Sequence, residues 1–155
     1  MTQTIRQATK ADIPVIADHI KSLAAHHGDV YVADLDFLIH SFDLENSGIT
    51  TFLGATETTP VSFAMVHPWA RFHENACALN LHLFHVFPQF RSQGYGRQMI
   101  DHIKDWAQLR RMSALYVSAD LQNEPTQQTY LKFGFTRITR GGAHFRMPLE
   151  TPESP

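Results

Sequence analysis

The segment that most constrains the fold is a strand, a glycine-containing loop and a helix in direct succession. Residues 78–86 (ALNLHLFHV) are apolar and alternating, and Phe87-Pro88 ends them. The loop Arg91-Ser92-Gln93-Gly94-Tyr95-Gly96 follows, and apolar residues then recur at helical spacing. Unpaired backbone N–H groups at the start of a helix, next to glycines that let a ligand approach closely, favour an anion. The segment therefore predicts a phosphate-binding loop, to which Arg91 and Arg97 add positive charge.

Two common phosphate-binding loops do not match this segment. A Walker loop needs Gly-Lys-Ser/Thr, and a dinucleotide loop needs a small residue where Met99 stands. An isolated Gly-x-Gly is also compatible with an ordinary tight turn before a core helix. A second motif favours binding: Asn123-Glu124-Pro125-Thr126 begins a short helix that carries Tyr130, and Gly134-Phe135 ends it.

Together the two motifs resemble those of the GCN5-related N-acetyltransferase (GNAT) superfamily. Arg91-x-x-Gly94-x-Gly96 resembles the coenzyme A loop of that family. Asn123, followed by Tyr130 and Gly134-Phe135, resembles its second signature, and the two occur in the family's order. The resemblance implies that acetyl-CoA is the cofactor and that the chain is an N-acetyltransferase.

Within the superfamily, the chain is most similar to the diamine and thialysine N-acetyltransferases. The similarity includes the opening Ile5–Asp12 and the segment Asn123–Thr126. Two positions differ from that branch. Ser92 stands where glycine is usual, and His82-Leu83 stand where those enzymes carry a Glu-Asp pair. The second difference argues against a polyamine substrate.

The resemblance implies a single α/β domain over residues 1–150, with a mixed, mostly antiparallel sheet of about seven strands and about four helices. Helices are predicted from Ile13 until His26-His27-Gly28-Asp29, near 33–44, after the loop and around Tyr130. Strands are predicted near 4–8, 50–56, 61–68, 76–86, 114–119, 136–139 and 144–149. The inward residues of the first two helices are predicted as Ile13, Ile16, Ala17, Ile20 and Leu23, and as Leu35, Leu38, Ile39 and Phe42. Residues 151–155 are expected to form a disordered tail.

Composition fits one globular domain. The chain has 155 residues, of which 43% are hydrophobic and 18% charged. A net charge of −2 without a Lys/Arg run argues against a nucleic acid partner. Cys77 is the only cysteine, and there is no apolar signal region or long apolar run, so a reducing cytoplasm and no membrane are expected.

The chemistry of amide formation indicates which roles need residues. An amine with a pKa near 10 must lose a proton, the carbonyl oxygen needs hydrogen-bond donors, and the coenzyme A thiolate must leave. The resemblance places Tyr130 beside the thioester sulfur as the acid, although a half-buried structural tyrosine is the alternative. It also places Phe84, His85 and Val86 beside the pantetheine arm, where a backbone N–H would bind the oxyanion. The other residues predicted to bind the cofactor are Arg91, Ser92, Gln93, Gly94, Tyr95, Gly96, Arg97 and Asn123.

His82 is the predicted general base. Strand alternation sends Asn80, His82 and Phe84 to one face, and Leu79, Leu81 and Leu83 to the face that packs under helices. An imidazole on the opposite face could accept the amine proton directly or through water. A histidine that only shapes the pocket, with solvent removing the proton, remains an alternative.

For the acceptor amine, the resemblance points to residues 26–36 and to the strand-to-loop stretch 67–71. Asp29 and Asp34 could hold an ammonium group, and Trp69 could stack on the substrate. Ordinary surface charge and a core aromatic are the alternatives. The ten histidines show no familiar ligand spacing, so no metal site is predicted.

The sequence therefore predicts an acetyl-CoA-dependent transferase that acetylates a primary amine of a small molecule, by direct attack in a ternary complex. A protein or peptide acetyltransferase and a non-catalytic acyl-CoA-binding module are the alternatives. The resemblance also implies a homodimer.

Overall fold

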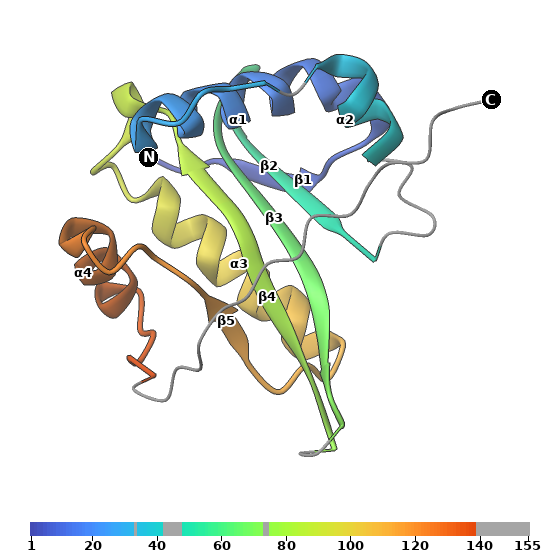
Figure 1. Ribbon diagram of the computed structural model, residues 1–155, viewed down its shortest axis with the longest axis vertical. Helices are drawn as coiled ribbons and strands as arrows, with labels where there is room; N and C mark the ends of the chain where they lie inside the picture. The colour runs from blue at the N-terminus through green and yellow to red at the C-terminus, as the bar shows by residue number, and fades with distance from the viewer. Residues whose placement is uncertain (33, 42–47, 73–74, 139–155) are drawn as a thin grey trace. The chain divides into compact units, whose positions relative to one another are not determined.

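The computed structural model describes residues 1–32, 34–41, 48–72 and 75–138 of the chain. It divides into two compact units, Met1–Asp120 and a second unit from Leu121 onward. The first contains, in chain order, β1 (Thr4–Gln7), α1 (Ile13–His27), α2 (Leu35–Ser41), β2 (Thr50–Thr56), β3 (Thr59–Arg71), β4 (Ala76–Val86), α3 (Tyr95–Leu109) and β5 (Leu115–Val117), with 3-10 turns at Lys10–Asp12 and Pro88–Phe90 (Figure 1). The described part of the second contains α4 (Glu124–Lys132).

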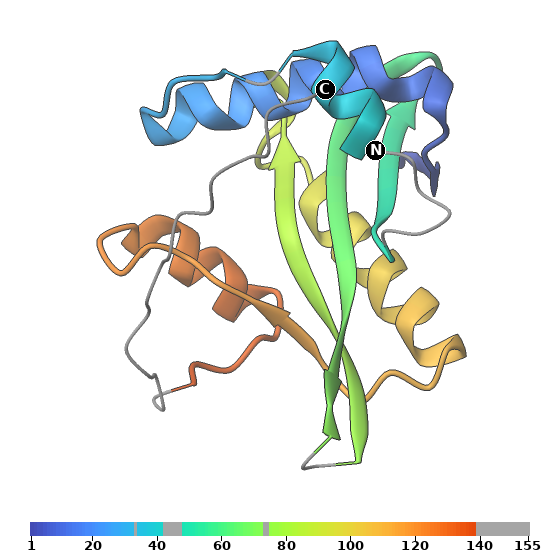
Figure 2. The ribbon, with the colours of Figure 1, turned by 45° about the vertical axis from the view of Figure 1, so that its right-hand side comes forward.

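The five described strands form one sheet in the order β1-β2-β3-β4-β5. Neighbouring strands are antiparallel except for β4 and β5, which are parallel. β3 and β4 are long, and they extend well beyond α1 and α2 (Figure 2). This mixed, mostly antiparallel sheet confirms the predicted α/β class.

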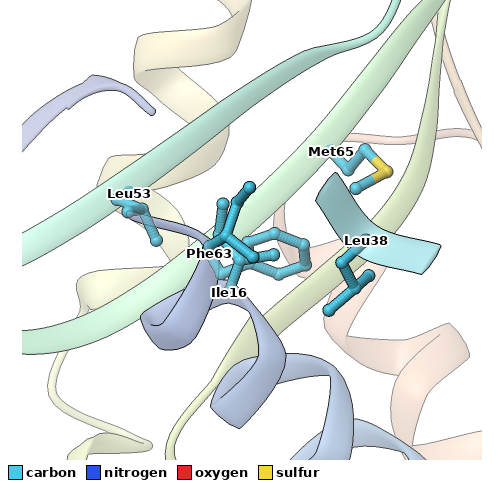
Figure 3. Close-up of a cluster of buried hydrophobic side chains, with 6 residues drawn as sticks. Ile16, Leu38, Leu53, Phe63 and Met65 are labelled. Atoms are coloured by element: carbon cyan, nitrogen blue, oxygen red, sulfur yellow. The ribbon is translucent and has the colours of Figure 1, made fainter. Parts of the chain in front are cut away.

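Helices cover both faces of the sheet. Phe52 and Leu53 are neighbours in β2 and therefore point to opposite faces. The Phe52 ring meets the rings of His102 and Trp106 from α3 edge-on. Leu53 instead belongs to a buried cluster with residues of α1, α2 and β3, namely Ile13, Ile16, Leu38, Phe63 and Met65 (Figure 3). One face thus packs on α3, and the other on α1 and α2.

A β-bulge interrupts β4 at His82. Met65 pairs with Leu83, but the next residue of β3, Val66, pairs with Leu81, so His82 is the extra residue. A bulge reverses which face the following residues occupy. Leu81, opposite Val66, lies on the α3 face, whereas Leu83 packs against the cluster under α1 and α2. The predictions that Leu83 shares a face with Leu79 and Leu81, and that Phe84 shares one with His82, are therefore wrong.

Most predicted elements are present close to their predicted bounds. β2 and β4 match residue for residue, and the stretch 67–71 belongs to β3. In α2, Leu38 is buried, but Leu35 and Ile39 are about half exposed, so their predicted inward positions are wrong. Residues 136–138 form no strand. Phe42 and the predictions for 139, 144–149 and 151–155 lie outside the described residues.

No helix in the described ranges is both long and apolar enough to span a membrane.

Candidate active site

The candidate site lies where β4 and β5 separate. β5 pairs with β4 only along Leu79–Leu81, and no described strand pairs with that side of β4 after the bulge. The Phe87 N–H donates to Val61 O at 3.1 Å. This bond shows which backbone N–H groups of β4 point toward β3 after the bulge, because they alternate along the strand. The N–H of His85 therefore faces β3, whereas the N–H of Val86 points to the side from which β5 has separated. Val86, and not His85, is positioned to offer a backbone donor.

The loop after β4 has the backbone that the sequence predicts for an anion site. Ser92 and Gly94 have positive φ angles of 60° and 86°, and Gly94 is the N-cap of α3. Glycine adopts this conformation without strain, whereas a side chain there is disfavoured. The first N–H groups of α3 have no partners within the helix. This end of α3 therefore has the backbone donors and the loop conformation of an anion site.

The side chains of the loop have different environments. Arg91 Nε donates to Val86 O at 3.0 Å, so it joins the loop to the end of β4. Gln93 is exposed and donates to Gln89 O. Tyr95 is only 2% exposed, and its ring lies edge-on to Phe90. Of the predicted cofactor residues, Tyr95 can therefore reach a ligand only through its backbone.

Beside the bulge, three polar side chains gather on the face opposite to α3. Asn80 Nδ2 lies 3.0 Å from His67 Nε2, and His67 Nδ1 lies 3.3 Å from Pro68 O. Because a carbonyl can only accept, the hydrogen bonds assign the proton of His67 to Nδ1. The exposed ring of His82 lies edge-on to His67, with 6.0 Å between centroids. His67 belongs to the stretch 67–71 predicted for the acceptor amine, but its contacts with Asn80 and His82 were not predicted.

Trp69 lies in a different cluster, farther along the same face. Its ring is 5.1 Å from that of Tyr116 in β5, and Arg71 lies 5.3 Å from the Trp69 ring and donates to Tyr116 Oη. Trp69 pairs with Ala78, four residues before His82, which corresponds to roughly 13 Å along a strand. The structure thus does not bring Trp69 beside His82.

Two buried histidines connect α1 to the end of β4. His19 Nδ1 lies 2.9 Å from His85 Nδ1, and the two residues are 0% and 3% exposed. Among the described residues, neither Nε2 atom has a hydrogen-bond partner. A buried polar atom without a partner costs about 1–3 kcal/mol. Burial, together with the charge of its partner, lowers the pKa of His19 to about 3. Burial, with the nearby charge of Arg91, lowers the pKa of His85 to about 4.

The two predicted aspartates lie outside the polar group around His82. Asp34 Oδ1 accepts a hydrogen bond from Phe37 N at 2.7 Å and so caps the start of α2. Asp29 follows α1, and its N–H donates to Ala24 O. Both side chains are exposed. Their contact with a substrate stays a prediction.

The second unit holds the other motif. Asn123 Oδ1 accepts from Thr126 N at 3.1 Å and caps α4, and Gly134 after the helix has φ of 95°. The Tyr130 ring is edge-on to Phe135, with 5.5 Å between centroids. Burial raises the pKa of the Tyr130 phenol to about 12, so this group keeps its proton at neutral pH. A protonated phenol is the form that a general acid requires.

The sequence profile of the acetyltransferase (GNAT) family matches residues 17–135, which include both motifs. The chain belongs to this family. It is an acetyl-CoA-dependent acetyltransferase, as other members of the GNAT family are. No curated protein sequence matches it significantly.

Several solved structures share the GNAT fold with this chain. One is a possible acetyltransferase from Clostridium difficile 630, with a TM-score of 0.82 and 16% identity over 96% of this chain and 100% of that one. Another is an aminoglycoside acetyltransferase from an uncultured soil metagenomic sample, in complex with sisomicin, with a TM-score of 0.79 and 15% identity over 96% and 97% of the chains. A third is a ribosomal-protein-alanine N-acetyltransferase from Brucella melitensis biovar Abortus 2308, with a TM-score of 0.78 and 17% identity over 95% and 100%. At these identities the likeness concerns the fold.

Within the described residues, no three His, Cys, Asp or Glu side chains gather as a metal site would require.

Proposed function

We propose that this GNAT acetyltransferase transfers the acetyl group directly to a primary amine of a small molecule, within a ternary complex. The observation that carries the proposal is the separation of β4 and β5 at the His82 bulge. It leaves the Val86 N–H on the open edge of β4, and His82, His67 and Asn80 lie nearer the bulge on the face opposite to α3. A thioester along this edge would have a backbone donor on one side and polar side chains on the other.

Each role in the proposed reaction falls to a particular group. The backbone of the loop around Gly94 binds the diphosphate of coenzyme A, with Arg97 adding positive charge. The Val86 N–H stabilises the oxygen of the acetyl group as the amine attacks. His82 accepts the amine proton, directly or through a water molecule, and His67 with Asn80 sets the polarity around it. Tyr130 protonates the departing thiolate.

The charge of the site favours a substrate with few amines. No described residue of β3, β4 or β5 is an aspartate or a glutamate, so these strands place no carboxylate on the face opposite to α3. The side chains on that face, such as those of His67 and Tyr116, are neutral, aromatic or basic. A polycation is poorly accommodated where no carboxylate compensates its charge. This speaks against polyamines, although the chain resembles the diamine and thialysine branch. A homodimer in the cytoplasm remains our expectation from the sequence.

The test is release of coenzyme A thiol from acetyl-CoA with a panel of amines. The panel contains monoamines, amino acids, polyamines, thialysine, an aminoglycoside and a lysine-bearing peptide. His82→Ala and Tyr130→Phe should each lower kcat by about a hundredfold or more with the preferred amine. Lys104→Ala, at an exposed position of α3, is the control and should leave kcat unchanged.

Three outcomes would contradict parts of this proposal. Turnover with the peptide alone would indicate a protein acetyltransferase. Tight coenzyme A binding without any turnover would indicate a binding module. An unchanged pH–rate profile in His82→Ala would show that another group or solvent takes the amine proton.

A further inference from the structure

The His19–His85 pair performs no step of the reaction proposed above, although it lies at the end of β4 that carries the Val86 N–H. His19 is 0% exposed, and its ring stacks between Phe63 and Phe87, at centroid distances of 5.5 and 4.0 Å. The ring of His85 lies edge-on to Phe87 at 5.1 Å. Two neutral imidazoles with Nδ1 atoms 2.9 Å apart must share one proton, so one ring donates and the other accepts.

Packing alone is a poor explanation for this pair. Each Nε2 atom is buried without a hydrogen-bond partner among the described residues. Two apolar rings of similar shape would fill the same space and would bury no unpaired polar atom. The hydrogen bond between the rings is therefore the feature that an apolar pair could not supply.

The pair is also unsuited to act as the general base. Burial holds the pKa values of His19 and His85 at about 3 and about 4. Such a weak base accepts a proton poorly from an ammonium group with a pKa near 10. The charged groups that bear on His85 are Arg91 of the loop and His26 and His27 at the end of α1, and all of them disfavour its protonation. Both rings thus stay neutral while the enzyme works.

The contacts around the pair show what it can hold in place. The backbone of His85 pairs with Phe63 of β3, and the Phe87 N–H bonds to Val61 O. Arg91, from the loop, bonds to Val86 O at 3.0 Å. The Nδ1–Nδ1 hydrogen bond adds α1 to these attachments at the point where the strand ends and the loop begins.

We propose that His19, acting through its hydrogen bond to His85, is a positioning residue for acetyl transfer that fixes the Val86 N–H against the acetyl oxygen. The inference rests on the proposed function because it takes Val86 as the oxyanion donor. It assigns to α1 a role in orienting the transition state, in addition to its part in the core.

The kinetic test compares three variants with the wild type. His19→Phe keeps an aromatic ring between Phe63 and Phe87 but removes the hydrogen bond. It should lower kcat by about tenfold or more, because small displacements of a catalytic donor are costly, while KM for acetyl-CoA changes less than about twofold. His19→Asn, which can still donate to the Nδ1 of His85, should recover part of kcat. The double variant His19→Phe/His85→Phe should regain stability without regaining kcat.

The double variant separates positioning from packing. If it recovers wild-type kcat together with its stability, the pair is only a packing element and the proposal is overturned. Thr51→Val is the matched control, since Thr51 Oγ1, like the two Nε2 atoms, is a buried polar atom without a partner among the described residues. This control should leave kcat unchanged.

A second readout needs no acceptor amine, so it stands even if the proposed substrate class is wrong. In hydrogen exchange, the Phe87 amide should exchange about tenfold faster in His19→Phe than in the wild type, relative to the Ile103 amide of α3. If the two amides change in parallel, the substitution acts on global stability alone and the proposal fails.

Discussion

Acidification should destabilise this protein through its two buried histidines. An imidazole in the unfolded chain has a pKa near 6.5, whereas burial lowers the pKa values of His19 and His85 to about 3 and about 4. At pH 5 the unfolded chain therefore binds protons that the folded chain does not. Stability is complete above pH 6.5 and falls as the pH is lowered toward the folded-state values. At 1.36 kcal/mol per unit, each ring removes about 2 kcal/mol between pH 8 and pH 5, with about 4 kcal/mol as the upper limit for the pair.

The assay is urea denaturation at unit steps from pH 8 to pH 5. Burial also lowers the pKa values of His26 and His102, so these rings add to the slope in the same direction. His19→Phe/His85→Phe removes the contribution of the pair alone, and the difference between wild type and variant isolates it. The Asp12 carboxyl does not interfere in this range. The hydrogen bond from Arg6 holds its pKa well below the usual value, so its contribution is lost only below about pH 4.

Equal losses of free energy in the wild type and the double variant between pH 8 and pH 5 would refute this reasoning. They would mean that the two imidazoles titrate in the folded protein as they do in the unfolded chain. An NMR titration that placed either ring near pH 6.5 would lead to the same conclusion.

Three further predictions concern the backbone of β2, the loop and the second unit. Gly54→Ala should cost about 1–3 kcal/mol in urea denaturation, because its Cβ would lie 2.1 Å from Gln3 Oε1; Gln3→Ala in the same chain should relieve part of this. Gly94→Ala, at a φ of 86°, should cost about 1 kcal/mol of folding free energy and should weaken acetyl-CoA binding in calorimetry. Ser92→Gly, at a φ of 60°, should neither lower the stability nor weaken acetyl-CoA binding. Wild-type stability should fall as the pH rises above 10, because the Tyr130 phenol ionises there in the unfolded chain but keeps its proton in the folded protein, where its pKa is about 12. Tyr130→Phe should make this fall smaller.

The sequence predicted the elements whose pattern is local. β2 and β4 begin and end where alternation and turn residues placed them. Helix α3 buries Met99, Ile100 and Ile103 as its spacing requires. α2 was predicted less well, because a short helix with apolar residues on several sides does not reveal which side meets the sheet. Its Leu38 is buried, but Leu35 is 49% exposed.

Residues that depend on pairing between strands were harder to predict. The sequence of β4 alternates without a break through residues 78–86, so nothing in it marks His82 as an extra residue. The bulge arises from the register with β3, where Val66 pairs with Leu81 and Met65 with Leu83. His67 was likewise missed as a partner of Asn80, because the two are 13 residues apart and meet only across the hairpin.

As the extra residue of the bulge, His82 affects the site through the register of β4 with β3. Before the bulge, Leu79 and Leu81 face α3 and pair with β5. Because the bulge reverses the faces, Leu83 and His85 then turn toward α1, where His85 meets His19. Without the extra residue, His85 would face α3 and could not reach α1. A single inserted residue thus determines which helix supports the end of β4.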